Sequence, residues 1–325
     1  QAIRYANADP NVAETSADRG RLTTRVEAKP PEKWQVGYFD GETEVVQVHI
    51  DSQTGKVRES WTGYQVAWPM ARGYEGQFGH ALNAPYVWIP LALVFLLGLF
   101  DFRRARKWVH LDLLVLLSFG ISHYFFNRGE IGLSVPLAYP PLIYLLVRML
   151  WIGFRGLGDR DGLRPSAPAA LLGIACLFLI AFRIALNIAD SGVIDVGYAG
   201  VIGADRITNG EPIYGEGAFP DDNPTGDTYG PLTYYAYVPF ELIFPWSGEW
   251  DSLPAAHAAA IFFDLATVAG LFLLGGRLRP DDPRAARATG ITLAFAWLAY
   301  PYTTFALQSN SNDALVAALL LCGLV

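Results

Sequence analysis

The chain has 325 residues, of which 52% are hydrophobic, 14% are aromatic and only 17% are charged. Its formal net charge of −7 argues against a nucleic-acid-binding protein, because phosphates require clustered Lys and Arg side chains. The charge is sparse in the long apolar runs and concentrated in residues 1–80 and 190–251. The sequence therefore favours an integral membrane protein with polar segments over an ordinary soluble domain.

Residues 1–80 are predicted to form a small α+β domain, with a helical segment followed by strands. The three runs with strand character are residues 34–38, 43–50 and 56–61. Residues 51–55 are typical of a turn in which Gly55 supplies a positive φ. The pattern VxVHIDxxTGKV in residues 46–57 resembles the PepSY domain, a small extracytoplasmic module often associated with inhibition or protein contacts. An unrelated β-hairpin domain is the alternative.

Seven apolar stretches approach the roughly 20 residues that a helix needs to cross a bilayer. They are residues 86–100, 110–126, 131–153, 167–188, 253–275, 288–306 and 312–325. These stretches predict an α-helical polytopic membrane protein with about seven spans. Because the chain starts at Gln1 and stops inside the last stretch, we expect further residues at both ends.

The basic residues of the loops predict the orientation in the membrane. Loops rich in basic residues follow the first, third and fifth stretches, and they contain Arg103, Arg104, Arg106, Lys107, Arg155, Arg160, Arg164, Arg277, Arg279, Arg284 and Arg287. Such loops face the cytoplasm. The N-terminal domain, the loop 189–252 and the turn 308–313 are therefore predicted to be extracytoplasmic.

We expect three parts: the domain 1–80, a three-span module 81–166, and a membrane core 167–325 that is truncated at its C-terminus. The core contains the loop 189–252, whose residues 190–251 include eleven acidic residues and one basic residue, Arg206. The loop is too long for a simple connector. Its apolar run 232–246 is broken by prolines, which predicts a helix in the membrane interface.

The order of these parts resembles the GT-C superfamily of membrane glycosyltransferases, especially the bacterial polyprenyl-phosphate-sugar-dependent mannosyl- and arabinosyltransferase-like branches. The matching elements are Asp195 with Tyr198, Gly210 with Tyr214, Tyr229 with Pro231 and Leu232, and Asp313 at the start of a later span. Gly230 stands where a proline is frequent in the family. The resemblance implies that a sugar is transferred from a polyprenyl-phosphate donor to a cell-envelope glycan acceptor outside the cytoplasm.

Sugar transfer requires a base that takes the proton of the acceptor hydroxyl, and a carboxylate suits this task. The resemblance implies that Asp195 is this base, and Asp190 is the competing candidate. Asp313 is expected to hold the acceptor hydroxyl or a divalent cation, with N-capping of the last span as the alternative. No other cofactor is expected.

Aromatic and charged residues of the same loop are candidates for binding the donor. Asp227 and Tyr229 are expected to line the sugar pocket, and Arg206 is the candidate for the donor phosphate. Tyrosine faces on which a sugar ring could stack are offered by Tyr198, Tyr214, Tyr234 and Tyr235. The alternative for these tyrosines is an aromatic belt at the membrane surface.

Two other classes of function remain open. The chain could be a non-enzymatic sensor or scaffold that binds a partner through its N-terminal domain, or a transporter, although no internal repeat is visible in the sequence. Arg183 and Asp264 lie within predicted spans, and ionisable residues at that depth are expected to pair.

Overall fold

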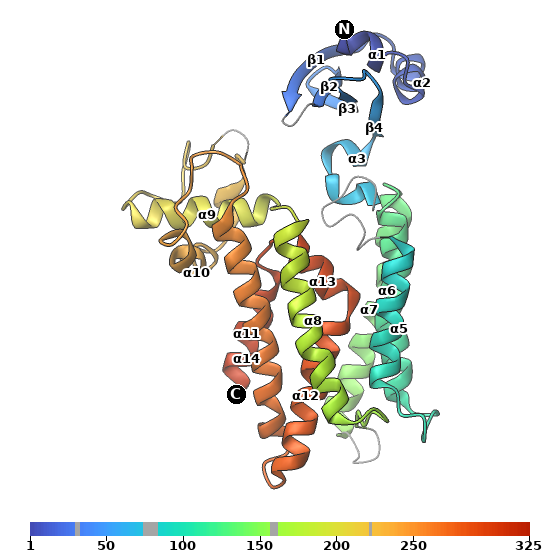
Figure 1. Ribbon diagram of the computed structural model, residues 1–325, viewed down its shortest axis with the longest axis vertical. Coiled ribbons are helices and arrows are strands. Elements are labelled where there is room, and N and C mark those ends of the chain that lie inside the picture. Colours follow the sequence, from blue (N-terminus) through green and yellow to red (C-terminus); the bar gives the residue numbers. More distant parts are fainter. Residues whose placement is uncertain (30–32, 74–83, 157–161, 221–222) are drawn as a thin grey trace. The chain divides into compact units, whose positions relative to one another are not determined.

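The computed structural model describes residues 1–29, 33–73, 84–156, 162–220 and 223–325 (Figure 1). The chain forms two compact units. The first unit contains Gln1–His80 and Val115–Trp151, and the second contains Ala81–Leu114 and Ile152–Val325. The predicted domain boundary at residue 80 lies outside the described residues, and the three predicted parts remain a prediction.

The first unit begins with helices α1 (Ala2–Ala6) and α2 (Pro10–Arg19), followed by a four-stranded antiparallel sheet. The strands are β1 (Thr23–Lys29), β2 (Lys33–Asp40), β3 (Thr43–Asp51) and β4 (Val57–Thr62), paired in that order. The α+β prediction is confirmed, but only three strands were predicted. The missed strand β1 lies at the edge of the sheet, where it is largely exposed and lacks the buried apolar face that identifies β3.

The core of this sheet is built by apolar residues of β2 and β3 that pack against the two N-terminal helices. Val36, Val46, Val48 and Ile50 are fully buried together with Ala6. The predicted turn after β3 is also present. Gly55 has a φ of +71°, and the Asp51 carboxylate accepts hydrogen bonds from the backbone N–H groups of Gln53 and Thr54.

A short helix α3 (Tyr64–Ala67) and a 3-10 helix η1 (Pro69–Arg72) follow the sheet. They pack against the turn between two long helices, α6 (Trp108–Phe126) and α7 (Ile131–Arg155). A Cβ atom on Gly129 in this turn would lie 2.9 Å from Gln65 Cγ, and one on Gly73 would lie 2.9 Å from the Asn127 carbonyl oxygen. The close approach of the two segments therefore uses glycines with positive φ.

The second unit contains the remaining helices. They are α5 (Pro85–Leu99), α8 (Ala169–Ala189), α9 (Asp195–Thr208), η3 (Gly226–Thr228), α10 (Pro231–Glu241), α11 (Pro254–Leu278), α12 (Pro283–Ala299), α13 (Pro301–Gln308) and α14 (Asp313–Leu324). Helix α9 runs across the ends of the long helices α8 and α11 (Figure 1). Buried apolar residues of α9, α10 and the start of α11 form the core at this end of the unit.

Four helices in the described part of the chain, not seven, are long and apolar enough to cross a membrane. They are α6, α7, α8 and α11. They indicate a multi-pass membrane protein. Much of their apolar surface is exposed in the chain by itself, as at Met149 and Phe154 on α7, which suits a lipid environment.

The other three predicted spans correspond to shorter helices. The first is α5, whose 15 residues reach only about 22 Å. The sixth is divided into α12 and α13, because Pro301 cannot donate a backbone hydrogen bond and Tyr300 before it is extended, with φ −73° and ψ 121°. The last is α14, with 12 residues. Apolar composition predicted these helices correctly but not their lengths.

The loop after α8 contains more helix than the sequence indicated. Residues 195–208 form α9, which was not predicted, because its three glycines weaken the helical pattern. The helix predicted within 232–246 is present as α10, but it ends at Glu241.

Candidate functional site

Asp195 and Asp313 occupy equivalent positions at the first residue of a helix. Asp195 begins α9 after the extended residue Ile194, and Asp313 begins α14 after Asn312. Both side chains are exposed. The N-terminal end of a helix carries a partial positive charge, which attracts an acidic side chain. Each aspartate can offer its carboxyl oxygens to a molecule outside the helix.

The two helix starts are brought together by the chain segments that precede them. The backbone N–H groups of Gly192 and Ile194 donate to the carbonyl oxygens of Gln308 and Ser309, at 3.2 and 3.1 Å. Gly197, in the first turn of α9, lies against the Asn310 carbonyl oxygen so closely that a Cβ atom would collide with it. Residues 192–197 and 308–313 thus run side by side, and we call this place the two-aspartate site.

Two tyrosines from the α10 region adjoin the site. Burial and, after it, the charge of Asp195 raise the pKa of Tyr229. Burial and then the charge of Asp313 raise the pKa of Tyr237, whose ring is fully buried between α9 and Phe263. The Tyr237 hydroxyl has no hydrogen-bond partner among the described residues. The Tyr237 hydroxyl is thus a neutral polar group that lies within the electrostatic influence of the Asp313 carboxylate.

A second contact joins α10 to the start of α14. The Asn312 side chain lies 3.5 Å from the Thr233 hydroxyl, and the Asn223 side chain donates to the Asp195 carbonyl oxygen at 3.1 Å. The starts of α9, α10 and α14 therefore meet in one region. Exposed carboxylates, hydroxyl groups and carboxamides gather there, which is an arrangement suited to a ligand with several hydroxyl groups.

A buried layer of polar side chains supports the site. Asn310 is fully buried and adopts a positive φ of 49°, which an asparagine tolerates better than most residues. Its side chain accepts a hydrogen bond from Asn187 at 2.8 Å and donates to Ser191 and to the Gly192 carbonyl oxygen. Asn187 also lies 3.0 Å from His257 Nδ1. This network joins α8, α11 and the turn before α14.

One helical turn before Asn187 on α8, Arg183 pairs with Asp264 of α11, as was expected from the sequence. Arg183 Nη2 donates to Asp264 Oδ1 at 2.6 Å, and both side chains are at most 5% exposed. The same aspartate oxygen accepts a hydrogen bond from Trp297, and Arg183 Nη1 donates to the Thr304 hydroxyl. Buried charges with this many partners hold α8, α11, α12 and α13 in one arrangement.

Other predicted site residues occupy different places. Arg206 lies 11 residues after Asp195, about 16 Å along α9, and is held by the Pro212 carbonyl oxygen and Glu211. Tyr198 is fully buried and stacks on Trp250, with ring centroids 4.6 Å apart. Its ring face is therefore occupied by packing. The structure does not bring Arg206 to the two-aspartate site.

The remaining predicted residues lie along the loop between α9 and α10 and at the end of α8. The Tyr214 hydroxyl donates to the Tyr229 carbonyl oxygen at 3.0 Å. Asp227 lies in η3, half-buried, and its charge contributes to raising the pKa of Tyr234 to about 12, an effect dominated by burial. Asp190 ends α8 as its C-terminal cap. The charge of Asp195 thus reaches Tyr229, to which Tyr214 is hydrogen-bonded.

Sequence reasoning missed Asn187, His257 and Asn310. One signal was available: Arg183 and Asn187 lie four residues apart, which places them on one face of α8. Polar residues at that depth require partners. The partners of Asn187 could not be predicted, because they come from residues more than 60 positions away in the chain.

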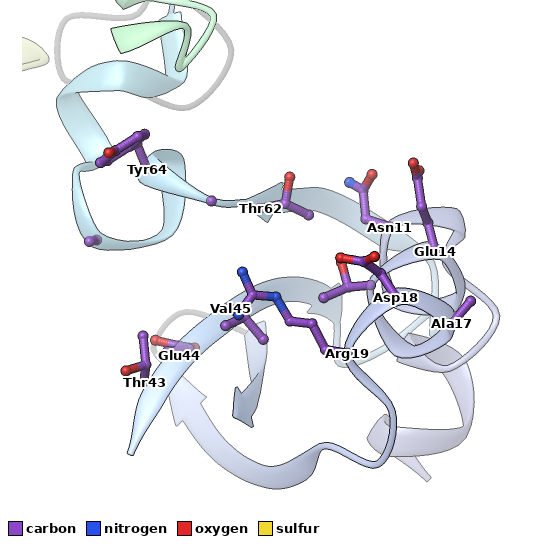
Figure 2. Close-up of a pocket in the computed structure, with 13 residues that line it drawn as sticks. Asn11, Glu14, Ala17, Asp18, Arg19, Thr43, Glu44, Val45, Thr62 and Tyr64 are labelled. Atoms are coloured by element: carbon purple, nitrogen blue, oxygen red, sulfur yellow. The ribbon is translucent and has the colours of Figure 1, made fainter. Parts of the chain in front are cut away.

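The first unit contains a separate cavity of about 990 Å³ between α2 and the sheet (Figure 2). Its lining includes the carboxylates Glu14, Asp18 and Glu44, together with Asn11 and Tyr64. Burial raises the pKa of Glu44. The Tyr64 ring, which is 55% exposed, stacks on Trp68 at 5.3 Å. Arg19 also lines the cavity, which is thus polar, with three carboxylates against one guanidinium group and an aromatic face at its border.

No group of three or more His, Cys, Asp or Glu residues placed to bind a metal ion occurs in the described part of the chain. No protein-family model, curated protein or solved structure matches this chain.

Proposed function

We propose that this chain is an integral membrane glycosyltransferase that moves a sugar from a polyprenyl-phosphate donor to a cell-envelope glycan. The observation that carries the proposal is the two-aspartate site. Asp195 and Asp313 are exposed at adjacent helix starts, at the end of a helical unit that contains two of the four candidate spans. An amphiphilic donor whose sugar lies at the membrane surface could reach such a site from the bilayer.

In the proposed reaction the acceptor hydroxyl oxygen attacks the anomeric carbon of the donor sugar. Asp195 takes the hydroxyl proton, the bond between the anomeric carbon and the phosphate oxygen breaks, and polyprenyl phosphate leaves with the electron pair. Asp313 accepts a hydrogen bond from the acceptor or holds a divalent cation. We expect Tyr229, which the charge of Asp195 reaches, to contact the sugar hydroxyl groups, while the buried Asn223 holds the backbone of Asp195 in position.

The test uses the full-length protein in nanodiscs with a panel of radiolabelled polyprenyl-phosphate sugars and an envelope-glycan extract as acceptor. We expect Asp195→Asn to reduce transfer about 100-fold or more, because the amide keeps the shape of the side chain but cannot take a proton. The matched control is Asp205→Asn, which removes a carboxylate from the other end of α9 and should leave transfer near the wild-type rate.

Transfer by Asp195→Asn at the wild-type rate would contradict the assignment of the base. Absence of transfer from every donor, with a folded wild-type protein, would contradict the enzymatic proposal. In that case a second candidate gains support: a membrane-anchored sensor that binds a ligand in the acidic cavity of the first unit. The cavity is the specific observation in favour of this alternative (Figure 2).

A further inference from the structure

A second cavity in the helical unit lies between the segment that leads into α8 and the first half of α12. Its volume is about 620 Å³. Arg164 before α8 and Arg279 after α11 line it, together with Asp282 and Thr289. Leu163, Pro165, Ala167, Ala169, Ala285 and Ala288 supply apolar walls. The cavity thus combines two guanidinium groups with an apolar interior.

The electrostatics of this cavity favour an anion. Neither Arg164 nor Arg279 forms an ion pair within the part of the chain that the structure describes. Asp282 contributes a carboxylate to the lining, but it caps α12 by accepting hydrogen bonds from the backbone N–H groups of Arg284 and Ala285 at 2.9 and 3.0 Å. Its negative charge is therefore partly compensated, whereas neither guanidinium group is paired with a carboxylate among the described residues, and each is a forked donor.

The cavity lies at the opposite end of α8 from the two-aspartate site. Helix α8 begins at Ala169, which lines the cavity, and ends at Ala189, near the buried residues that support the site. Its 21 residues span about 31 Å, which is close to the thickness of the hydrocarbon core of a bilayer. A cavity at this level faces the lipid headgroups of the other membrane surface, which the positive-inside rule predicts to be cytoplasmic.

We propose that this cavity binds the phosphate group of an anionic membrane lipid. Arg164 and Arg279 contact the phosphate oxygens, and the alanine-rich walls accommodate the glycerol and the first carbons of the acyl chains. Basic pockets between membrane helices on the cytoplasmic side bind such headgroups through the same combination of charge and apolar surface. This inference is independent of the proposed transfer reaction.

The experiment measures lipid binding to the full-length protein after delipidation in detergent. Phosphatidylglycerol, phosphatidylcholine and inorganic phosphate are titrated separately, with native mass spectrometry counting bound lipids and the melting temperature reporting stabilisation. We expect one phosphatidylglycerol to bind preferentially. The double variant Arg164→Gln, Arg279→Gln should bind it at least tenfold more weakly, while its weak binding of phosphatidylcholine should not change.

The control Arg284→Gln, Arg287→Gln removes the same charge from residues of α12 that do not line the cavity, and it should bind like the wild type. Ala288→Phe fills the cavity while retaining both arginines, so it tests the site if the double variant does not fold. Equal weakening in both double variants, or no weakening in either, would overturn the proposal. Complete displacement of the lipid by inorganic phosphate would assign the site to a soluble anion instead.

Discussion

Charged residues in this protein occur in two settings with different physical consequences. Asp195 and Asp313 are exposed at helix starts, so they remain accessible to a ligand at little cost in desolvation. Arg183 and Asp264 are buried in the helical unit, where each charge depends on the other and on nearby hydrogen-bond donors and acceptors. The two exposed aspartates are suited to binding or reacting with a ligand. The buried pair is suited to holding helices in position.

A pair of titratable residues in the first unit, His49 and Glu59, makes the stability of the sheet depend on pH. The Glu59 carboxylate accepts a hydrogen bond from His49 Nδ1 at 2.7 Å, and this bond lowers the pKa of Glu59 to about 2. A folded-state pKa below the unfolded value contributes stability above about pH 4.5 that is lost as the pH falls toward 2. Burial also lowers the pKa of His49, which adds to the loss in acid.

We therefore expect the β3–β4 hairpin to lose on the order of 2–3 kcal/mol of stability on acidification. Hydrogen–deuterium exchange of residues 46–62 in the full-length protein, measured at about pH 6 and about pH 3, would report it. The variant Glu59→Gln should be less protected at the higher pH and change less on acidification. Glu42→Gln, in the exposed β2–β3 turn, is the control; an identical pH response in all three proteins would contradict this mechanism.

At the scale of elements, helix α9 owes its position to three glycines at intervals of three residues. Gly197 faces the Asn310 carbonyl oxygen, Gly200 faces the Tyr237 ring and Gly203 faces the Tyr234 ring. Glycine lowers helix propensity, so these positions cost stability in the helix by itself. The close approach of α10 and of the segment before α14 offsets that cost and brings the start of α9 against the segment that leads into α14.

Gly200→Ala tests this packing. A Cβ atom at residue 200 would lie 2.8 Å from the fully buried ring of Tyr237, which has little room to move. We expect a destabilisation of about 1–3 kcal/mol, larger than the gain of about 0.5–1 kcal/mol in helix propensity. The measurement is the melting temperature in detergent. Gly276→Ala on α11, where a Cβ atom meets nothing within 4 Å, should be neutral or slightly stabilising; equal effects would refute the packing argument.

The break between α12 and α13 also belongs to this scale. An apolar stretch of sequence predicted one long span, but Pro301 ends α12 and lets α13 begin in a new direction. Thr303 and Thr304 of α13 then reach the buried Arg183. If α12 continued without a break, Thr303 and Thr304 would lie further along its axis and would not reach Arg183.

At the scale of the whole molecule, the membrane topology follows from α11. Its 25 residues are long enough to cross the hydrocarbon core, so the loop 190–251 and the loop after Leu278 should face opposite sides. The basic residues predict that the first of these loops is extracytoplasmic.

Single cysteines can test this topology in a background in which Cys176 and Cys322 are replaced by serine. In intact cells, a membrane-impermeant maleimide should label Glu216→Cys and should label Asp281→Cys only after permeabilisation. Both positions are exposed, so access and not burial decides the result. The reverse pattern would invert the predicted orientation, and labelling of both in intact cells would show that α11 does not cross.

The sequence by itself determined the local properties of this protein. Apolar runs indicated a membrane protein, the pattern around Gly55 predicted a turn, and buried charge requirements predicted that Arg183 and Asp264 pair. The first two depend on composition or on a few neighbouring residues, whereas the pairing followed from the cost of leaving a charge unpaired at membrane depth. The aspartates at 195 and 313 were selected from the order of motifs that carries the resemblance, and their role stays a prediction.

Only the tertiary structure decided which of these residues meet. The alignment of residues 192–194 with 308–309, the positive φ of Asn310 and the approach of α10 to α9 depend on packing between segments that lie far apart in the chain. The structure also separated Arg206 from Asp195, since both lie on one rigid helix. Hydrophobic pattern determines which segments are helical and apolar, whereas their lengths, breaks and partners depend on contacts that no local pattern contains.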